Sequence, residues 1–165
     1  GQGSFTVNIA LIEKMEPVLG VIFAPALDRM FHGFKGGGSV EKSPGREGPI
    51  RVRQLPESGS RAVASRSHRN EETNLWLEAH QIRETVSIGS SLKFCLVACG
   101  EADVYPRFGP TMEWDTAAGD AILRAAGGLT TNPDGSVFRY GKPGYRNSSF
   151  IASGQPDRWE PKASV

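Results

Sequence analysis

Residues 89–128 read GSSLKFCLVACGEADVYPRFGPTMEWDTAAGDAILRAAGG, and this stretch decides the class of fold. Ser90–Gly100 has the apolar pattern of a helix that starts with serine and stops at glycine. Ala102–Pro106 is short and strand-like, and Trp114–Gly128 is a second helical pattern that also stops at glycine. Helices that alternate with short strands predict an α/β layer with parallel strand pairing.

The same alternation continues on both sides of this stretch. Asn70–Gln81 is typical of a helix. The residues expected near its apolar side are Leu75, Leu77 and Ala79. Four further segments are strand-like: Arg61–Ser65, Thr85–Gly89, residues 128–131 (GLTT) and residues 148–153 (SSFIAS). The second part of the chain is therefore expected to form one α/β unit.

The first third of the chain predicts an antiparallel meander. Three apolar runs are strand-like: Phe5–Glu13, Pro17–Leu27 and Met30–Phe34. Their connections are short, which favours antiparallel neighbours. The next segment, Lys35–Pro49, is rich in Gly, Pro, Ser and charge and is expected to be a flexible surface loop.

No predicted helix precedes the meander, so one face of its sheet would have nothing to pack against. A small sheet with one bare face is poorly stable, so we expect a further segment to precede Gly1. Residues 1–55 are then the remainder of an antiparallel amino-terminal subdomain plus its loop. Residues 56–165 are expected to be a carboxyl-terminal α/β subdomain.

Composition narrows the class of protein. The chain has 165 residues, 38% apolar and 22% charged, which is typical of a globular protein. A net charge of +1 gives no general attraction to nucleic acid or membranes. Cys95 and Cys99 lie four residues apart on one predicted helix face, as buried thiols do, and too few soft ligands accompany them for a metal site. The expected location is the cytoplasm, with the inner face of the membrane as an alternative.

Polar residues follow predicted strands at three places, where ligands gather in open α/β sheets. The first is Ser65–His68. It is either a ligand-binding segment or a polar turn that leads to Asn70 as a helix N-cap.

The second place is Gly89–Lys93, at the start of a predicted helix. Two serine hydroxyls, the free N–H groups of a first helical turn and a lysine would bind an anion such as phosphate. The alternative is ordinary N-capping by Ser90.

The third place joins Arg107 to Asp115. An arginine clamps phosphate or stacks on a base. Asp115 at the positive end of a helix stays ionised, as a ligand of a hard cation must, or it is simply an N-cap followed by small residues that allow close packing. Together the three places predict binding of a phosphorylated small molecule with Mg²⁺.

The motif Trp-Asp-x-Ala-Ala-Gly at residues 114–119 resembles the second signature of the inositol monophosphatase superfamily. FTVNIALIE, SRSH, GSSLKFC and YPRFGP resemble its CysQ-type 3'(2'),5'-bisphosphate nucleotidases most closely. The resemblance covers nearly the whole chain and is weakest in Lys35–Ser60 and after Gly128. It implies a layered α/β/α/β/α sandwich, here without its amino-terminal helices and first strands.

The resemblance also implies roles for individual residues. Asp115 matches a metal-binding aspartate. The positions that match substrate-binding residues are His68, Ser90, Ser91, Lys93 and Arg107. The family's Asp-Pro-x-Asp-Gly-Thr motif and earlier acidic ligands, which hold most of the metal and activate water, do not occur in this chain. Asp115 alone cannot hold two Mg²⁺ ions, so the isolated chain is expected to be inactive.

The implied function is Mg²⁺-dependent removal of the 3'-phosphate of 3'-phosphoadenosine 5'-phosphate to give AMP. The implied partners are a bisphosphorylated nucleotide and the missing amino-terminal segment, with no nucleic acid polymer and with a homodimer as one possible assembly. Two alternatives stay open: an inositol phosphate phosphatase, and a non-catalytic module that binds a nucleotide phosphate.

Overall fold

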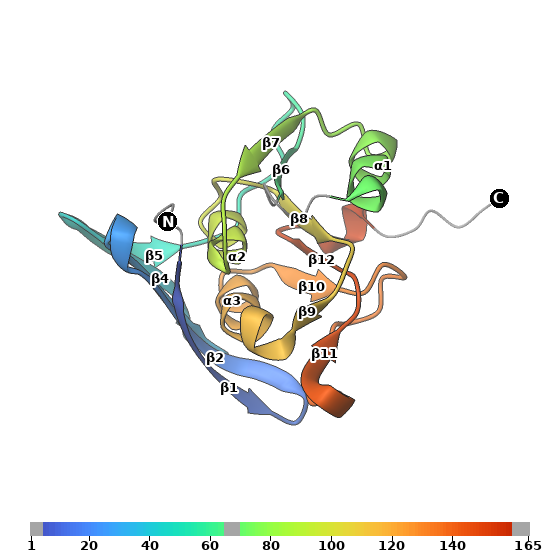
Figure 1. Cartoon of the computed structure of the whole chain (residues 1–165). Helices are drawn as coiled ribbons and strands as arrows, with labels where there is room; N and C mark the ends of the chain where they lie inside the picture. Colours follow the sequence, from blue (N-terminus) through green and yellow to red (C-terminus); the bar gives the residue numbers. More distant parts are fainter. Residues whose placement is uncertain (1–4, 65–69, 160–165) are drawn as a thin grey trace.

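The computed structural model describes residues 5–64 and 70–159. Two five-stranded sheets enclose the helices α2 (Leu92–Ala98) and α3 (Glu113–Ala125), and α1 (Glu71–Ala79) covers the second sheet from its other side (Figure 1). The layers are thus sheet, helices, sheet, helix. The predicted α/β class is confirmed.

The first sheet is an antiparallel meander in chain order. Its strands are β1 (Val7–Glu13), β2 (Glu16–Ala24), β3 (Arg29–Phe34), β4 (Gly38–Ser43) and β5 (Arg46–Ile50). Lys14 and Met15 form the first turn with positive φ of 49° and 66°, which matches the twist of a tight hairpin. The three predicted strands and their antiparallel order are confirmed, although the second ends at Ala24 and Pro25–Leu27 forms a 3-10 turn.

The predicted flexible loop over Lys35–Pro49 is wrong, because this segment forms the hairpin of β4 and β5. Gly36 and Gly37 lie in one turn and Pro44 and Gly45 in the other, where Gly45 has a φ of +72°. Gly48 and Pro49 instead lie within β5. Ser39 is buried, and its hydroxyl donates to the Ile122 carbonyl at 2.7 Å. This bond ties β4 to α3, and the sequence pattern gave no sign of it.

The second sheet is mixed and has the order β10-β12-β8-β6-β7. These strands are Leu129–Thr131, Phe150–Ser153, Val104–Arg107, Arg61–Ala64 and Glu84–Ser87. β6 pairs in parallel with β7 and β8, which confirms the predicted parallel pairing, whereas β12 is antiparallel to β8 and β10. A separate two-stranded pair joins β9 (Thr111–Met112) to β11 (Arg146–Asn147), and 3-10 turns occupy Pro143–Tyr145 and Pro156–Arg158.

Successive residues of the second sheet face opposite layers. Val63 and Tyr105 join the main core with α2 and α3, whereas Ala62 and Val104 pack in a second cluster with Leu77 of α1. Leu77 therefore lies on the buried side of α1 as predicted. The other two residues expected on that side are exposed, because the buried stripe passes through Thr73 and Leu77 instead of Leu75 and Ala79.

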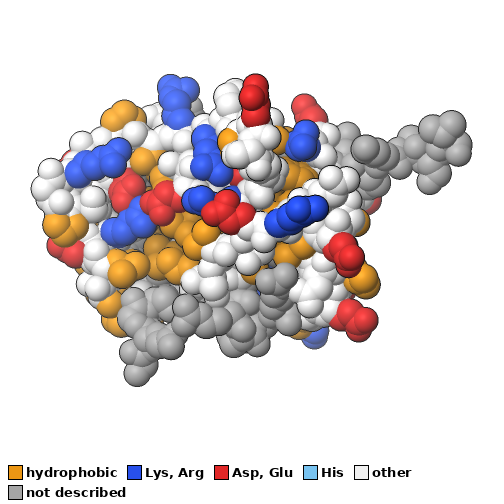
Figure 2. Space-filling model, turned by 90° about the horizontal axis from the view of Figure 1, so that it is seen from above, with side chains coloured by type: hydrophobic (Ala, Val, Ile, Leu, Met, Phe, Trp, Pro, Cys, Tyr) orange, Lys and Arg blue, Asp and Glu red, His pale blue; other side chains and the backbone are white. Residues whose placement is uncertain are grey.

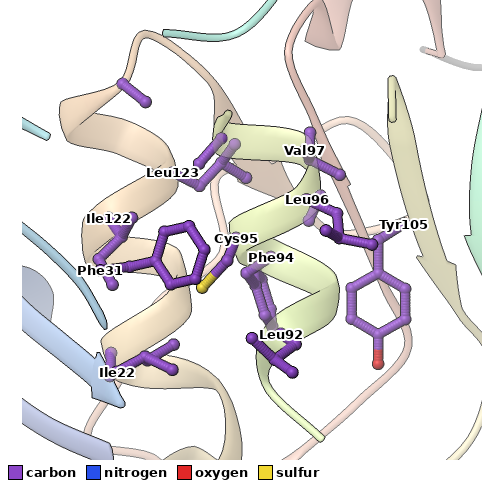
Figure 3. Packing of buried hydrophobic residues seen from close by; sticks show 14 of the residues in the cluster. Ile22, Phe31, Leu92, Phe94, Cys95, Leu96, Val97, Tyr105, Ile122 and Leu123 are labelled. Carbon is purple, nitrogen blue, oxygen red and sulfur yellow. The ribbon is translucent and has the colours of Figure 1, made fainter. Parts of the chain in front are cut away.

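The main core lies between the two sheets. Figure 3 shows Ile22 and Phe31 of the first sheet reaching towards α3 and Cys95, with Tyr105 on the opposite side of α2. The Phe94 ring meets Tyr105 edge-on and stacks on Phe150, with centroids 5.3 and 5.6 Å apart. Both cysteines are free, as predicted, and burial raises the pKa of both thiols.

Small residues of α3 allow close packing on two sides. A Cβ at Gly119 would lie 2.6 Å from Phe94, and a Cβ at Gly20 of β2 would lie 2.2 Å from the Ala118 carbonyl oxygen. The close packing predicted for residues 117–119 is therefore confirmed.

The outer face of β1 is bare in the part of the chain that the structure describes. Val7, Ile9 and Leu11 alternate along it and are 53%, 61% and 57% exposed. β1 is also an edge strand, so one row of its backbone groups pairs with no described strand. The expected bare face of the meander is thus observed. No helix of the described residues is long and apolar enough to span a membrane.

Candidate functional site

A cavity of about 390 Å³ lies where β1, the start of α2, the end of β8 and the start of α3 meet. Six of its polar lining residues are Asn8, Ser90, Ser91, Lys93, Arg107 and Asp115. The cavity thus joins five of the six predicted site residues. The sixth, His68, and the whole stretch Ser65–His68 lie outside the described residues.

The two serines of this site do not cap α2, so the N-capping interpretation of Ser90 is wrong. The helix begins at Leu92, and no side chain caps its start. The Ser90 hydroxyl bonds to the Thr6 hydroxyl instead, and the Ser91 hydroxyl donates to Asn8 Oδ1 at 2.6 Å. Ser90 also has a φ of +57°, which non-glycine residues rarely adopt. These bonds fix the start of α2 against β1.

Lys93 is a buried cation, only 6% exposed. Its ammonium donates to the Ser90 carbonyl at 2.8 Å and lies 5.3 Å from the centre of the Tyr105 ring. Burial and the positive charge of Arg107 lower the pKa of Lys93 to about 8, whereas the Asp115 carboxylate acts to raise it. Within the described residues, no carboxylate forms an ion pair with Lys93.

Arg107 supplies the second cation. It ends β8, and its Nη2 donates to the Pro110 carbonyl at 3.3 Å. Its Nε is buried and has no hydrogen-bond partner among the described residues. Because a buried donor without a partner is costly, a ligand oxygen at this position would stabilise the arrangement.

Asp115 is the one carboxylate among the described residues that line the cavity. Asp115 is the third residue of α3, and the N-cap position is occupied by Met112. The interpretation of Asp115 as the N-cap is therefore wrong. Its Oδ2 nevertheless accepts the Met112 N–H at 3.2 Å and closes the first turn. The side chain is exposed and lies in the first turn of a 13-residue helix, whose positive end attracts negative charge.

The donor chemistry of Asp115 fits one ligand of Mg²⁺, which prefers carboxylate oxygen and keeps much of its water. The described residues contain one group of three potential ligands elsewhere, namely Glu41, Cys99 and Glu101 at the opposite end of α2. Arg29 donates to both of these carboxylates, at 2.7 and 2.6 Å, and neutralises them. A thiol and two carboxylates that already bind a guanidinium do not resemble a Mg²⁺ site.

Sequence reasoning missed the contribution of β1 to the site. Thr6 and Asn8 link to each other and to the two serines of the α2 start. Both are polar residues on one side of an otherwise apolar predicted strand, two positions apart. That alternation was the signal that could have placed them at the site.

The chain belongs to the inositol monophosphatase family, which it matches over residues 1–163. Among curated relatives, it is 49% identical over 138 residues to the 3'(2'),5'-bisphosphate nucleotidase CysQ of Salmonella typhimurium, covering 84% of this chain and 55% of the relative. The CysQ of Escherichia coli is 44% identical over 154 residues, covering 90% of this chain and 61% of the relative. The chain thus spans a little over half the length of these relatives.

Solved structures show the same fold. CysQ from Bacteroides thetaiotaomicron superposes with a TM-score of 0.83 at 38% identity, over 93% of this chain and 64% of that one. An inositol monophosphatase from Anabaena gives a TM-score of 0.74 at 28% identity, over 93% and 62% of the two chains. The layered fold expected from the motif at residues 114–119 is therefore confirmed for the part of the family fold that this chain contains.

Proposed function

We propose that this chain is part of a Mg²⁺-dependent phosphatase that removes the 3'-phosphate of 3'-phosphoadenosine 5'-phosphate. The observation that carries the proposal is the pair of unneutralised cations, Lys93 and Arg107, that shares a cavity with Asp115. Such a cavity offers a phosphate two positive charges and offers a metal ion one hard ligand. The relatives named as bisphosphate nucleotidases support the same assignment.

Each group has a distinct part in this function. Lys93 and Arg107 hold the phosphate that does not react, and the hydroxyls of Ser90 and Ser91 complete its binding site. Asp115 holds Mg²⁺, which when bound lowers the pKa of its water and neutralises charge on the reacting phosphate. Hydrolysis adds water to the 3'-phosphorus and breaks its bond to the ribose oxygen, which takes a proton. The products are AMP and inorganic phosphate.

The substrate distinguishes this proposal from an inositol phosphate phosphatase. An inositol monophosphate has no second phosphate to occupy the Lys93 and Arg107 positions. A site built for a bisphosphate discriminates against a substrate that leaves buried donors unpaired. The second cation in the cavity therefore favours the nucleotide.

We further propose that an amino-terminal segment completes the enzyme. The chain spans 55% and 61% of two CysQ relatives, which contain additional residues. The open edge of β1 and its bare side chains Val7, Ile9 and Leu11 offer a surface for that segment. It would bring the further carboxylates that Mg²⁺ requires, so the isolated chain should be inactive. We place the enzyme in the cytoplasm, where its nucleotide substrate would be found.

Phosphate release by the full-length enzyme, meaning this chain with its amino-terminal segment, tests the proposal. With Mg²⁺ we expect 3'-phosphoadenosine 5'-phosphate to be hydrolysed with a kcat/KM at least about tenfold above that of inositol monophosphate. A preference for inositol monophosphate would support the alternative phosphatase. Binding of the bisphosphate without turnover would support the non-catalytic module.

A further inference from the structure

Glu113 makes a set of contacts that the proposed function does not use. It is the first residue of α3, and its side chain is 6% exposed. Its Oε2 accepts the Gly141 N–H and its Oε1 accepts the Lys142 N–H, both at 2.9 Å, and the Lys142 ammonium lies 3.0 Å from Oε1. Both oxygens of the buried carboxylate are therefore engaged by donors of residues 141 and 142.

The turn at Gly141 makes this contact possible. Gly141 has a φ of +81°, a left-handed conformation that glycine adopts without strain. In this conformation two successive backbone N–H groups point at one carboxylate, an arrangement that binds anions. Residues 140–147 are thus anchored to the first turn of α3 through one side chain.

Residues 140–147 also contact residues that precede and residues that follow Asp115 in the chain. Asn147 lies opposite Thr111 in the β9–β11 pair, and its Nδ2 donates to the hydroxyls of Thr111 and Thr116 at 3.1 and 3.0 Å. The Tyr140 hydroxyl also donates to the Thr116 hydroxyl, at 3.3 Å. Thr116 directly follows Asp115 and lines the same cavity.

The other strand of this pair reaches the carboxylate itself. Met112 lies opposite Arg146, and its N–H is the group that binds Asp115 Oδ2. The orientation of the Asp115 carboxylate therefore depends on the backbone of β9, and the position of β9 depends on residues 140–147.

We propose that Glu113 is a positioning residue for Asp115, acting through residues 140–147. The inference rests on the proposed function of Asp115 as a metal ligand. Residues that orient a metal ligand typically change metal affinity or activity about 10- to 100-fold when they are replaced. Glu113 should have an effect of this size although it does not reach the cavity.

The test compares Glu113→Gln with Asp103→Asn in the full-length enzyme. Asp103 is a matched control, since it is also a buried carboxylate that binds a backbone N–H, that of Arg61 at 2.7 Å, and a cation, Arg53 at 2.8 Å. It lies at the other end of β8 from Arg107. Both variants lose a buried ion pair, so both should lower the melting temperature.

Only Glu113→Gln should act on the site. We expect it to weaken Mg²⁺ binding, measured by calorimetry, about tenfold, and to lower kcat similarly while KM changes less than about threefold. Hydrogen exchange at the Met112 amide should become faster in Glu113→Gln and stay unchanged in Asp103→Asn. Equal effects of the two variants on Mg²⁺ affinity and on Met112 exchange would overturn the inference.

If Glu113→Gln does not fold, a second pair of variants tests the same inference. Gly141→Ala and Gly45→Ala both place a side chain at a positive φ in open space, so their backbone strain is similar. Gly141→Ala should accelerate Met112 exchange, and Gly45→Ala should not. Amide exchange requires no turnover. If the enzyme hydrolysed no phosphate ester, the proposed function would be refuted, but the exchange rates of the Met112 amide would still decide whether Glu113 acts on β9.

Discussion

The cations at the two ends of α2 differ in whether a carboxylate of the chain neutralises them. Beyond its last turn, Arg29 is held by Glu41 at 2.7 Å and by Glu101 at 2.6 Å. At its first turn, Lys93 shares a cavity with Arg107, and no described carboxylate forms an ion pair with either. Burial alone would lower the pKa of both Arg29 and Lys93, but the two carboxylates raise the pKa of Arg29.

In the proposed function, this contrast separates a structural cation from cations that bind a ligand. A buried charge is costly unless a partner neutralises it. At Arg29 the protein supplies that partner itself, so the ion-pair cluster needs nothing more. At Lys93 and Arg107 no described carboxylate supplies such a partner, and we propose that a bound anion does so instead. Both signs of charge also intermingle on the face seen in Figure 2, in agreement with a net charge of +1. We therefore attribute the proposed attraction for phosphate to this cavity and not to the overall charge.

The largest effect should come from Asp115→Asn in the full-length enzyme. The amide keeps the size of the side chain and an oxygen that can accept the Met112 N–H, but it removes the charge. We expect kcat to fall more than about 100-fold and activity to need a higher Mg²⁺ concentration. Steady-state rates at several Mg²⁺ concentrations measure both. Wild-type rates and Mg²⁺ dependence would mean that Asp115 only closes the first turn of α3.

A smaller effect is expected when the cavity loses one of its cations. Lys93→Ala and Arg107→Ala should each weaken binding of 3'-phosphoadenosine 5'-phosphate to the full-length enzyme about 10- to 100-fold, the worth of one charge-assisted hydrogen bond. Arg29→Ala is the control, because it removes a neutralised cation of the same protein. It should lower the melting temperature and leave the dissociation constant within about twofold. Calorimetry decides, and equal weakening by Arg29→Ala would refute the contrast between the two ends of α2.

Anion binding should also depend on pH through Lys93. Arg107, Asp115 and Tyr105 face it, and burial raises the pKa of the Tyr105 phenol, which keeps the phenol neutral. Because the pKa of Lys93 is about 8, its charge disappears as pH rises through that value. Sulfate keeps its own charge over this range, so its affinity should fall several-fold, about fivefold, between about pH 7 and 9. Lys93→Met should remove the dependence, and an unchanged slope in that variant would exclude Lys93 as its source.

The smallest effect is a gain in stability when Lys93 becomes methionine. Its pKa is lowered from 10.5 to about 8 in the folded chain, so the charged form opposes folding. This cost is fully present below pH 8 and is lost as pH rises from 8 to 10.5. Lys93→Met should therefore raise stability at pH 7 by on the order of 1–3 kcal/mol, or a few degrees in melting temperature. Above about pH 10.5 the gain should vanish, and a gain independent of pH would point to better packing instead.

The sequence was sufficient for much of the fold, because its alternation of patterns is local. The two helices and the strand in residues 89–128 and the meander of the first third could be read from periodicity, turn residues and glycine stops. The β4–β5 hairpin could not, since its stability depends on the contact of Ser39 with α3, far away in the chain. Gly and Pro residues occur both in the tight turns of hairpins and in irregular loops, so they do not distinguish the two.

The candidate site was only partly predictable, for a similar reason. Ser90, Ser91, Lys93, Arg107 and Asp115 follow the strands predicted from sequence, and the rule that ligands gather at strand ends groups them without knowledge of the fold. Asn8 lies on another sheet, so only the packing of β1 against α2 places it there. Glu113 precedes the helix predicted over Trp114–Gly128, and its neighbours in sequence predicted no role for it. Its role depends on Gly141, 28 residues away.

The most direct test of the central claim is the substrate preference of Arg107→Ala in the full-length enzyme. The claim is that Lys93 and Arg107 hold the phosphate that does not react. The measurement is kcat/KM for 3'-phosphoadenosine 5'-phosphate and for inositol monophosphate, in the wild type and in the variant. We predict a loss of about 10- to 100-fold on the bisphosphate and less than about threefold on the monophosphate, which has no second phosphate to lose. Equal losses on the two substrates would contradict the claim, because Arg107 would then serve the reacting phosphate or the fold.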